Sequence, residues 1–176
     1  MKIQSVTVRH DAAQDRIVLV ARDSQSEQVL LLTRRLTFSL LTALGKLIAK
    51  SQGNTRLEQA GLQDELLSMK HAQALSQVRQ SQADQASPRA PSKRLPSRLL
   101  IQIDIKSDAN GHLLSFSDSG GLVANLALDA GQLHWFVERL ATHSQAAAWG
   151  RAIPVPEWLA VEAKAGALQG RTYSVH

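Results

Sequence analysis

Residues 99–140 read LLIQIDIKSDANGHLLSFSDSGGLVANLALDAGQLHWFVERL, and this stretch decides the fold class. Apolar residues alternate with polar ones from Leu99 to Ile105, which predicts a half-buried strand. Asn110-Gly111 is a strong hairpin signal, and a second apolar run with its own turn follows it. A third apolar run leads to Asp129, which can cap a helix with an apolar stripe. The stretch therefore predicts three strands followed by a helix.

The same order of elements occurs in residues 1–50. Apolar residues alternate or cluster within residues 5–8, 17–20 and 29–32, and a helical apolar face follows Thr33. An offset of 96 residues places Thr33 on Asp129 and also registers most of the apolar positions. We therefore predict a two-layer α+β fold built from tandem, pseudo-symmetric βββα repeats of antiparallel meanders plus a helix. The sequence leaves open whether the six strands form one continuous sheet or two.

Two further segments separate the repeats. Residues 51–80 place leucines among good helix formers, which predicts an inserted amphipathic helix. Residues 81–98 contain three prolines and several unopposed basic residues, which is typical of a flexible basic linker. The predicted organisation is a first repeat at 1–50, the inserted helix at 51–80, the linker at 81–98, the second repeat at 99–149 and a partly ordered Trp/Pro tail at 150–176.

Composition limits the function classes. The chain has 176 residues, 44% of them hydrophobic, which is enough to bury a core. It has no cysteine, so disulfides, thiolate metal sites and a cysteine nucleophile are excluded. It contains no apolar run of membrane-spanning length and no signal-peptide block, so we expect no membrane association and a cytoplasmic location.

Motifs for catalysis or cofactor binding are missing from the sequence. No phosphate-binding loop and no nucleophile elbow occurs. The six histidines lack the spacing of a helical metal site. His10 and His112 fall near equivalent turns of the two repeats, where solvated turn residues are the favoured interpretation over a shared site. We expect a protein that is not an enzyme and that uses no cofactor, metal or small-molecule substrate.

An interaction module that binds another protein or itself is the preferred function. The internal duplication, the inserted helix and the Trp/Pro tail all favour protein binding, and a dimer is the expected form of self-association. The candidate partner-binding residues are Leu62, Leu66, Met69, Trp149 and Trp158.

A nucleic-acid-binding protein is the alternative. Residues 1–50 carry a net charge of +4 and residues 51–98 a net charge of +3, whereas residues 99–176 carry −2. The repeat resembles in outline the duplicated sheet-plus-helix domains of the PUR and whirly proteins, which carry an extra strand per repeat. That resemblance is architectural and transfers no residues. The predicted strands offer only Phe116 for stacking on bases, so contacts to the phosphate backbone are expected rather than base reading. The candidate residues are Arg34, Arg35, Arg89, Lys93, Arg94 and Arg98.

Overall fold

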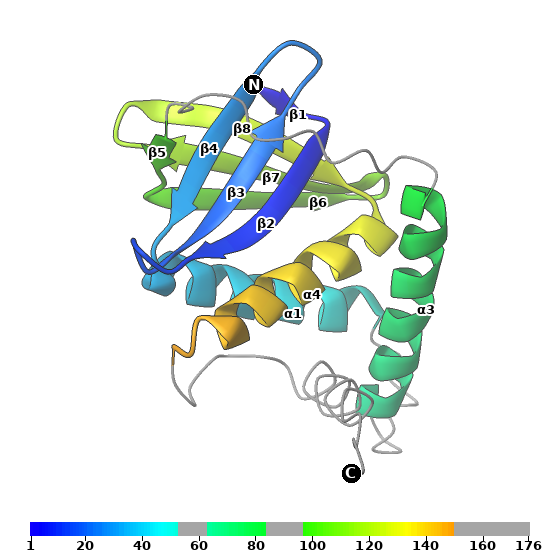
Figure 1. Cartoon of the computed structure of the whole chain (residues 1–176). Helices are drawn as coiled ribbons and strands as arrows, with labels where there is room; N and C mark the ends of the chain where they lie inside the picture. Colours follow the sequence, from blue (N-terminus) through cyan, green and yellow to red (C-terminus); the bar gives the residue numbers. More distant parts are fainter. Residues whose placement is uncertain (53–62, 84–96, 150–176) are drawn as a thin grey trace.

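The structure is a computed structural model, and it describes residues 1–52, 63–83 and 97–149 (Figure 1). Within these residues the chain forms two four-stranded sheets and three helices, which confirms the predicted α+β class. The strands are β1 (Lys2–Ile3), β2 (Ser5–Asp11), β3 (Arg16–Arg22), β4 (Glu27–Leu32), β5 (Ser97–Leu99), β6 (Gln102–Asp108), β7 (Gly111–Asp118) and β8 (Gly121–Leu128). The helices are α1 (Arg34–Gln52), α3 (Gln63–Ala83) and α4 (Ala130–Ala146).

Each sheet takes strands from both halves of the chain. Sheet A has the order β1-β8-β7-β6, and sheet B has the order β2-β3-β4-β5. The short strand β1 pairs in parallel with β8, and the short strand β5 pairs in parallel with β4. The other neighbours are antiparallel. The sequence left open whether the strands form one continuous sheet or two, and the structure has two. The strands of the two sheets run in clearly different directions in Figure 1.

The single strand predicted from Leu99 to Ile105 is wrong, because the chain changes sheet in the middle of it. The backbone N–H of Leu100 donates to Leu31 in sheet B at 2.9 Å, and the N–H of Ile101 donates to Ser117 in sheet A at 2.9 Å. Leu100 is 1% exposed, whereas Leu99 and Ile101 are exposed. The alternation read from the sequence therefore reverses where β5 ends and β6 begins.

Both predicted helix caps are present. Thr33 Oγ1 accepts a hydrogen bond from the N–H of Leu36 at 3.2 Å, which satisfies one of the free donors at the start of α1. The carboxylate of Asp129 accepts from the N–H of Gln132 at 2.7 Å, and Gln132 Oε1 accepts from the N–H of Asp129 at 3.0 Å. This reciprocal pair is a capping box, which fixes the first residue of α4.

One continuous core joins the two halves. It includes Leu41 and Leu44 of α1 and Phe136 of α4, together with inward residues of both sheets such as Leu19 and Phe116. Helix α4 contacts α1, α3 and strand β2. In Figure 1, α1 and α4 lie together below the sheets, and α3 stands at one side against α4.

The predicted boundaries shift at the segments between the halves. Helix α3 falls largely within the predicted 51–80 helix and extends to Ala83, whereas β5 takes the last two residues of the predicted linker. Residues 84–96 of that linker and the 150–176 tail lie outside the described residues. Among the helices described, none is both long and apolar enough to cross a membrane.

Candidate interaction surface

The outer face of sheet A is exposed, and its side chains form three rows across the strands. Because successive residues of a strand point to opposite faces, the residues that alternate with the buried ones share this outer face. The strand pairings give the rows Lys106–Leu113–Ala127, Asp104–Ser115–Asn125–Lys2 and Gln102–Ser117–Leu122. We call these residues the sheet A surface.

Large apolar side chains reach solvent on and beside this surface. Leu122 is 63% exposed and Leu113 is 37% exposed, and both belong to the sheet A surface. Ile101 is 58% exposed and immediately precedes β6, and Leu99, at the end of β5, is also exposed. The other large hydrophobic residue exposed within the described chain is Met69 on α3, and Leu99 belongs to sheet B. Leu113 and Leu122 lie in the two outer rows of the sheet A surface with the polar middle row between them, so they give this surface two separate apolar points.

The polar side chains between these apolar positions largely satisfy one another. Ser115 Oγ donates to Asn125 Oδ1 at 2.7 Å. Gln102 Nε2 donates to both carboxylate oxygens of Asp104, at 2.9 and 3.0 Å. Within the described part of the chain, the Lys106 ammonium makes no ion pair. Lys2, which is exposed on the same surface, makes none there either, so the surface offers two positive charges without an ion pair, and Lys106 lies beside the exposed carboxylate of Asp104.

Strand β6 forms an open edge of sheet A. It pairs with β7 over its whole length without a register shift, and no described strand pairs with its other side. Among the other edge strands, β1 and β5 are two and three residues long, and β2 is in contact with α4. The β6 edge is therefore the longest edge of either sheet that the described elements leave open.

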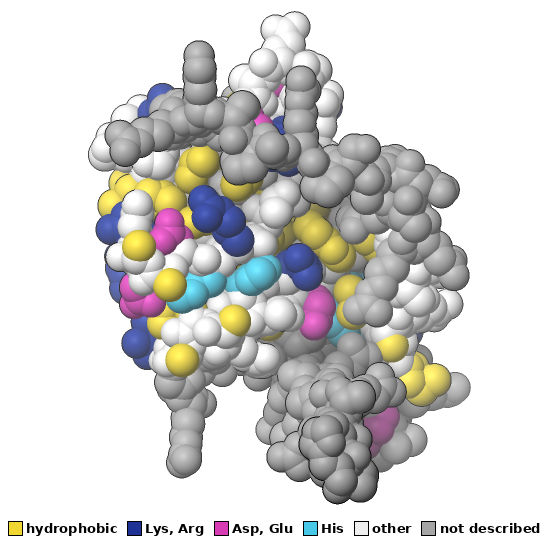
Figure 2. All heavy atoms as spheres, viewed as in Figure 1, with side chains coloured by type: hydrophobic (Ala, Val, Ile, Leu, Met, Phe, Trp, Pro, Cys, Tyr) yellow, Lys and Arg dark blue, Asp and Glu magenta, His cyan; other side chains and the backbone are white. Residues whose placement is uncertain are grey.

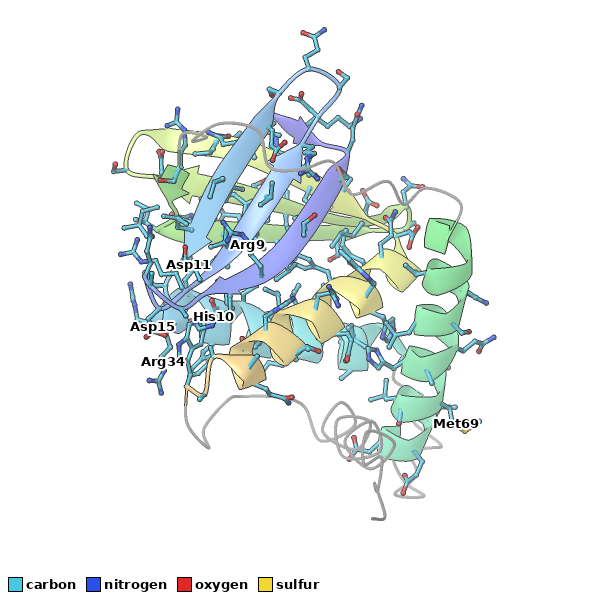
Figure 3. All side chains as sticks on the ribbon, in the orientation of Figure 1. Arg9, His10, Asp11, Asp15, Arg34 and Met69 are labelled. Atoms are coloured by element: carbon cyan, nitrogen blue, oxygen red, sulfur yellow. The ribbon has the colours of Figure 1, made fainter. Side chains whose placement is uncertain are left out.

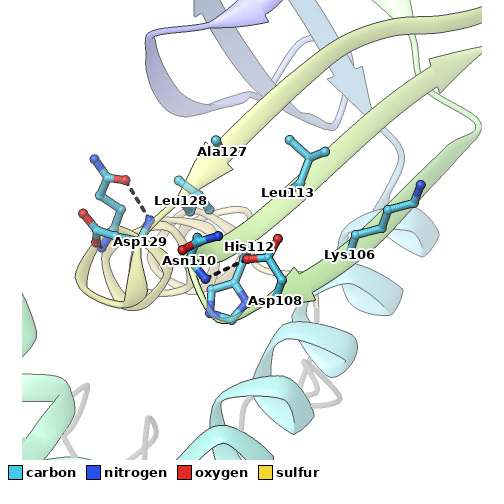
Figure 4. A pocket seen from close by; sticks show the side chains of 10 residues that line it. Lys106, Asp108, Asn110, His112, Leu113, Ala127, Leu128 and Asp129 are labelled. Carbon is cyan, nitrogen blue, oxygen red and sulfur yellow. Dashed lines mark hydrogen bonds between the residues drawn. The ribbon is translucent and has the colours of Figure 1, made fainter.

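A shallow pocket of about 380 Å³ lies at one end of the sheet A surface (Figure 4). Lys106, Leu113 and His112 line it from β6 and β7, and the start of α4 closes it. Ser107 Oγ and His112 Nδ1 form a hydrogen bond at 2.9 Å. Asp129, which also lines the pocket, is already engaged in capping α4. The pocket is thus a recess at the end of the sheet A surface, and the His112 imidazole that lines it is hydrogen-bonded to Ser107.

The predicted partner-binding residues fall in different environments. Met69 is 70% exposed on α3, and Leu66 is half-buried on the same helix. Trp149 is 3% exposed and belongs to the core, so its indole is not presented to a partner in this structure. Leu62 and Trp158 lie outside the described residues.

The predicted nucleic-acid residues are likewise dispersed. Arg34 and Arg35 are exposed at the start of α1. Arg34 donates to the carbonyl oxygen of Trp149, and its guanidinium lies 5.4 Å from the centre of the Phe38 ring. Arg98 lies in β5 and donates to Asp118 at 2.9 Å, an ion pair that lowers the pKa of Asp118. Arg89, Lys93 and Arg94 lie outside the described residues.

A cluster of aromatic and charged side chains joins the β2–β3 turn to the end of α4. Trp149 Nε1 donates to Asp15 Oδ1 at 2.5 Å, and His10 Nε2 lies 3.6 Å from the same oxygen. Within the described structure, the Nε2 atoms of His10 and His143 are buried without a hydrogen-bond partner. Burial lowers the pKa of His143, and the nearby charges of Arg139 and His10 lower it further.

The figures place this cluster at one corner of the molecule. Figure 3 shows His10, Asp15 and Arg34 close together where β2, the β2–β3 turn and α1 meet. Figure 2, in the same view, shows histidine side chains next to each other with basic side chains beside them. The described residues contain no group of three or more His, Asp or Glu side chains able to hold a metal ion. The contacts of this cluster connect elements of the fold, and we interpret it as structural.

A second pair of histidines is buried between α3 and α4. His71 Nδ1 and His134 Nδ1 are 2.9 Å apart, and His71 Nε2 lies 3.4 Å from a carboxylate oxygen of Glu138. Both imidazoles are almost fully buried. Burial, followed by the charge of His71, lowers the pKa of His134 to about 4. The sequence carries no signal that pairs these residues, because they lie 63 positions apart on two helices.

Comparison with known proteins gives no match: no family model fits the chain, and neither a curated protein nor a solved structure is similar to it.

Proposed function

We propose that the protein is a non-catalytic interaction module that binds another protein or itself through the sheet A surface. The observation that carries this proposal is the exposure of Leu113 and Leu122 on a sheet face that no described element covers. Burying two such side chains against a partner contributes favourable free energy without any catalytic group. The polar row between them, in which Ser115 and Asn125 are hydrogen-bonded to each other, offers a partner polar atoms at fixed positions.

We further propose that the two halves are copies of one unit. In support, the start of α1 at Arg34 and the start of α4 at Ala130 differ by the offset of 96 that the sequence pattern gives. Each half also donates one short strand to the sheet of the other half. A shared core stabilises two units that are each too small to bury much apolar surface alone.

The first prediction concerns the double variant Leu113→Ser/Leu122→Ser. We expect it to fold and to retain roughly one tenth or less of the bound protein partner, because two exposed anchors lose their apolar contact. The measurement is affinity capture with the full chain from nuclease-treated host lysate, followed by quantitative mass spectrometry. Met69→Ser, which removes a side chain that is 70% exposed on α3, is the matched control.

The outcomes separate the candidate surfaces. Equal loss of partner from the double variant and from Met69→Ser would contradict the sheet A surface as the main site. Unchanged capture by both variants would contradict both apolar surfaces.

Nucleic-acid binding is the second candidate function, and the exposure of Arg34 and Arg35 at the start of α1 favours it. Paired guanidinium groups make salt-sensitive contacts with phosphates. The same capture without nuclease tests it: bound nucleic acid that is lost in Arg34→Gln/Arg35→Gln supports this function. Bound nucleic acid that is retained by this variant excludes these two arginines as the contact.

A further inference from the structure

We infer that the open β6 edge is a self-association site, at which a second copy of the chain pairs antiparallel with β6 about a two-fold axis through Ile105. The inference rests on the proposed function and makes it more specific, because it names the partner as another copy. This pairing joins sheet A of one copy to sheet A of the other and gives one continuous eight-stranded sheet.

The first support is the condition of the edge. An open strand edge presents unpaired backbone N–H and C=O groups, and proteins commonly protect such edges with proline, bulges, very short strands or charged side chains, lysine above all. Of these devices β6 carries only the charged residues, and its Lys106 shares the exposed face with Asp104. Strand β6 contains no proline, is seven residues long and has no register shift against β7. Its side chains Ile103 and Ile105 are partly buried and pack against the core, which holds the strand in place.

The second support is the charge pattern of the strand. A two-fold axis through Ile105 pairs all seven residues of β6 with the same strand of the second copy. In this register Asp104 of each copy lies directly opposite Lys106 of the other, on the exposed face. Two opposite-charge pairs therefore flank the axis, and the Lys106 ammonium, which has no ion pair within the described chain, gains one.

Neighbouring registers lack this complementarity. A two-fold axis through Asp104 places two carboxylates opposite each other, and an axis through Lys106 places two ammonium groups opposite each other. Like charges directly opposite are destabilising in antiparallel pairs. The register with the largest overlap is thus also one in which the charges attract. An isologous contact of this kind uses the same patch on both copies and closes as a dimer.

The sheet A surface continues across such an interface. Gln102, Asp104 and Lys106 occupy the β6 end of all three rows. Pairing at β6 therefore brings together two sheet A surfaces, and the exposed Leu113 and Leu122 of both copies lie on one extended face. A self-association through β6 leaves these leucines available to another protein.

Charge-exchange variants of the full chain test the proposal. Asp104→Lys gives two lysines at the paired positions, and Lys106→Asp gives two aspartates. Each variant alone is expected to form a dimer roughly 10- to 100-fold weaker than the natural sequence, because both attractive pairs become repulsive. An equimolar mixture of the two variants is expected to restore dimers, since every lysine then faces an aspartate. The double variant Asp104→Lys/Lys106→Asp is expected to dimerise like the natural sequence.

Sedimentation equilibrium over a range of concentrations measures the association, and native mass spectrometry identifies the mixed dimer. Lys46→Asp, which makes the same charge change at an exposed position of α1, is the matched control and is expected to leave the dimer unchanged. Thermal unfolding followed by circular dichroism verifies that each variant folds.

Each result is decisive. Weaker dimerisation of each single variant, together with restored dimerisation of their equimolar mixture, supports the β6 pairing. A natural chain that stays monomeric, or single variants that dimerise as well as the natural chain, overturns it. The proposed function is judged separately by partner capture with Leu113→Ser/Leu122→Ser, which leaves β6 intact, so one proposal can fail while the other holds.

Discussion

Trp149 connects three parts of the fold that are distant in sequence. Its indole N–H donates to Asp15 at 2.5 Å, and its ring meets those of His10 and Phe38 edge-on. Arg34 donates to its carbonyl oxygen. Trp149 therefore holds the end of α4 against the β2–β3 turn and the start of α1. The sequence indicates an apolar residue here, but a docking residue and a core residue have the same sequence signal.

Two substitutions of Trp149 separate the stability contributed by the buried volume of its ring from the stability contributed by its hydrogen bond. We expect Trp149→Ala to lower the free energy of unfolding by about 3–5 kcal/mol, because it removes a large buried ring. Trp149→Phe keeps most of the ring and loses the donation to Asp15, so we expect a loss of about 1–2 kcal/mol. Urea titration followed by circular dichroism measures both. A loss below about 1 kcal/mol for Trp149→Ala would show that the indole is not part of the core.

The buried histidine pair predicts that stability depends on pH. The pKa of His134 is about 4 in the folded chain and 6.5 as the ordinary value, so between these values the unfolded chain binds more protons. The free energy of unfolding must therefore fall as the pH is lowered from about 6.5 to 4. The expected loss between pH 7 and pH 5 is about 2 kcal/mol from this group.

Urea unfolding at a series of pH values tests this sign, with His134→Gln as the comparison. The variant removes the titrating group, so its stability is expected to vary less over the same interval. Some slope is expected to persist, because burial also lowers the pKa of His143. A variant with the same slope as the natural chain would contradict the assignment to His134.

At the scale of single elements, helix α4 depends on the cap at its first turn. Asp129 accepts from the N–H of Gln132, and the Gln132 side chain accepts from the N–H of Asp129. We expect Asp129→Ala to lower the free energy of unfolding by about 1 kcal/mol and Asp129→Ser to lower it much less, since serine also caps helices. Thermal unfolding of the two variants is the measurement, and equal losses would indicate that the cap is not the cause.

Elements whose signals are local were predictable from the sequence. The caps at Thr33 and Asp129 depend on neighbouring residues only, and the helices begin where those residues indicate. The short strands β1 and β5 were not predicted as separate strands. Two or three residues carry no periodicity of their own, and only pairing with β8 or β4 makes them strands.

The break between β5 and β6 at Leu100 is a second feature that depends on long-range pairing and not on the local sequence pattern. Leu99, Ile101, Ile103 and Ile105 alternate regularly, so the pattern indicates one strand with one buried face. The chain instead passes from sheet B to sheet A between Leu100 and Ile101, and the buried face changes with it. Reading a strand from alternating apolar residues assumes that the whole strand belongs to one sheet. Here the consecutive residues Leu100 and Ile101 hydrogen-bond to two different sheets.

At the scale of the whole molecule, the candidate surface depends on strand order. Leu113 and Leu114 are adjacent, so a strand can bury only one of them, and the structure buries Leu114. The sequence alone does not state which face the rest of the molecule covers. Nor does it state that β6 is an edge, because that follows from the pairing of β1 with β8 on the opposite side of the sheet. Residues of interaction surfaces are therefore harder to predict than residues of caps and turns.

The exchange of strands between the halves has a consequence for synthesis on the ribosome. Strand β1 (Lys2–Ile3) is translated well before its partner β8, which ends at Leu128. At about 5–20 residues per second, the interval between their appearances is roughly 6–25 s. Throughout that interval β1 has no partner, and for the earlier part of it the outer edge of β4 waits for β5. Sheet B thus gains its last strand only after Leu99 has been translated, and sheet A only after Leu128.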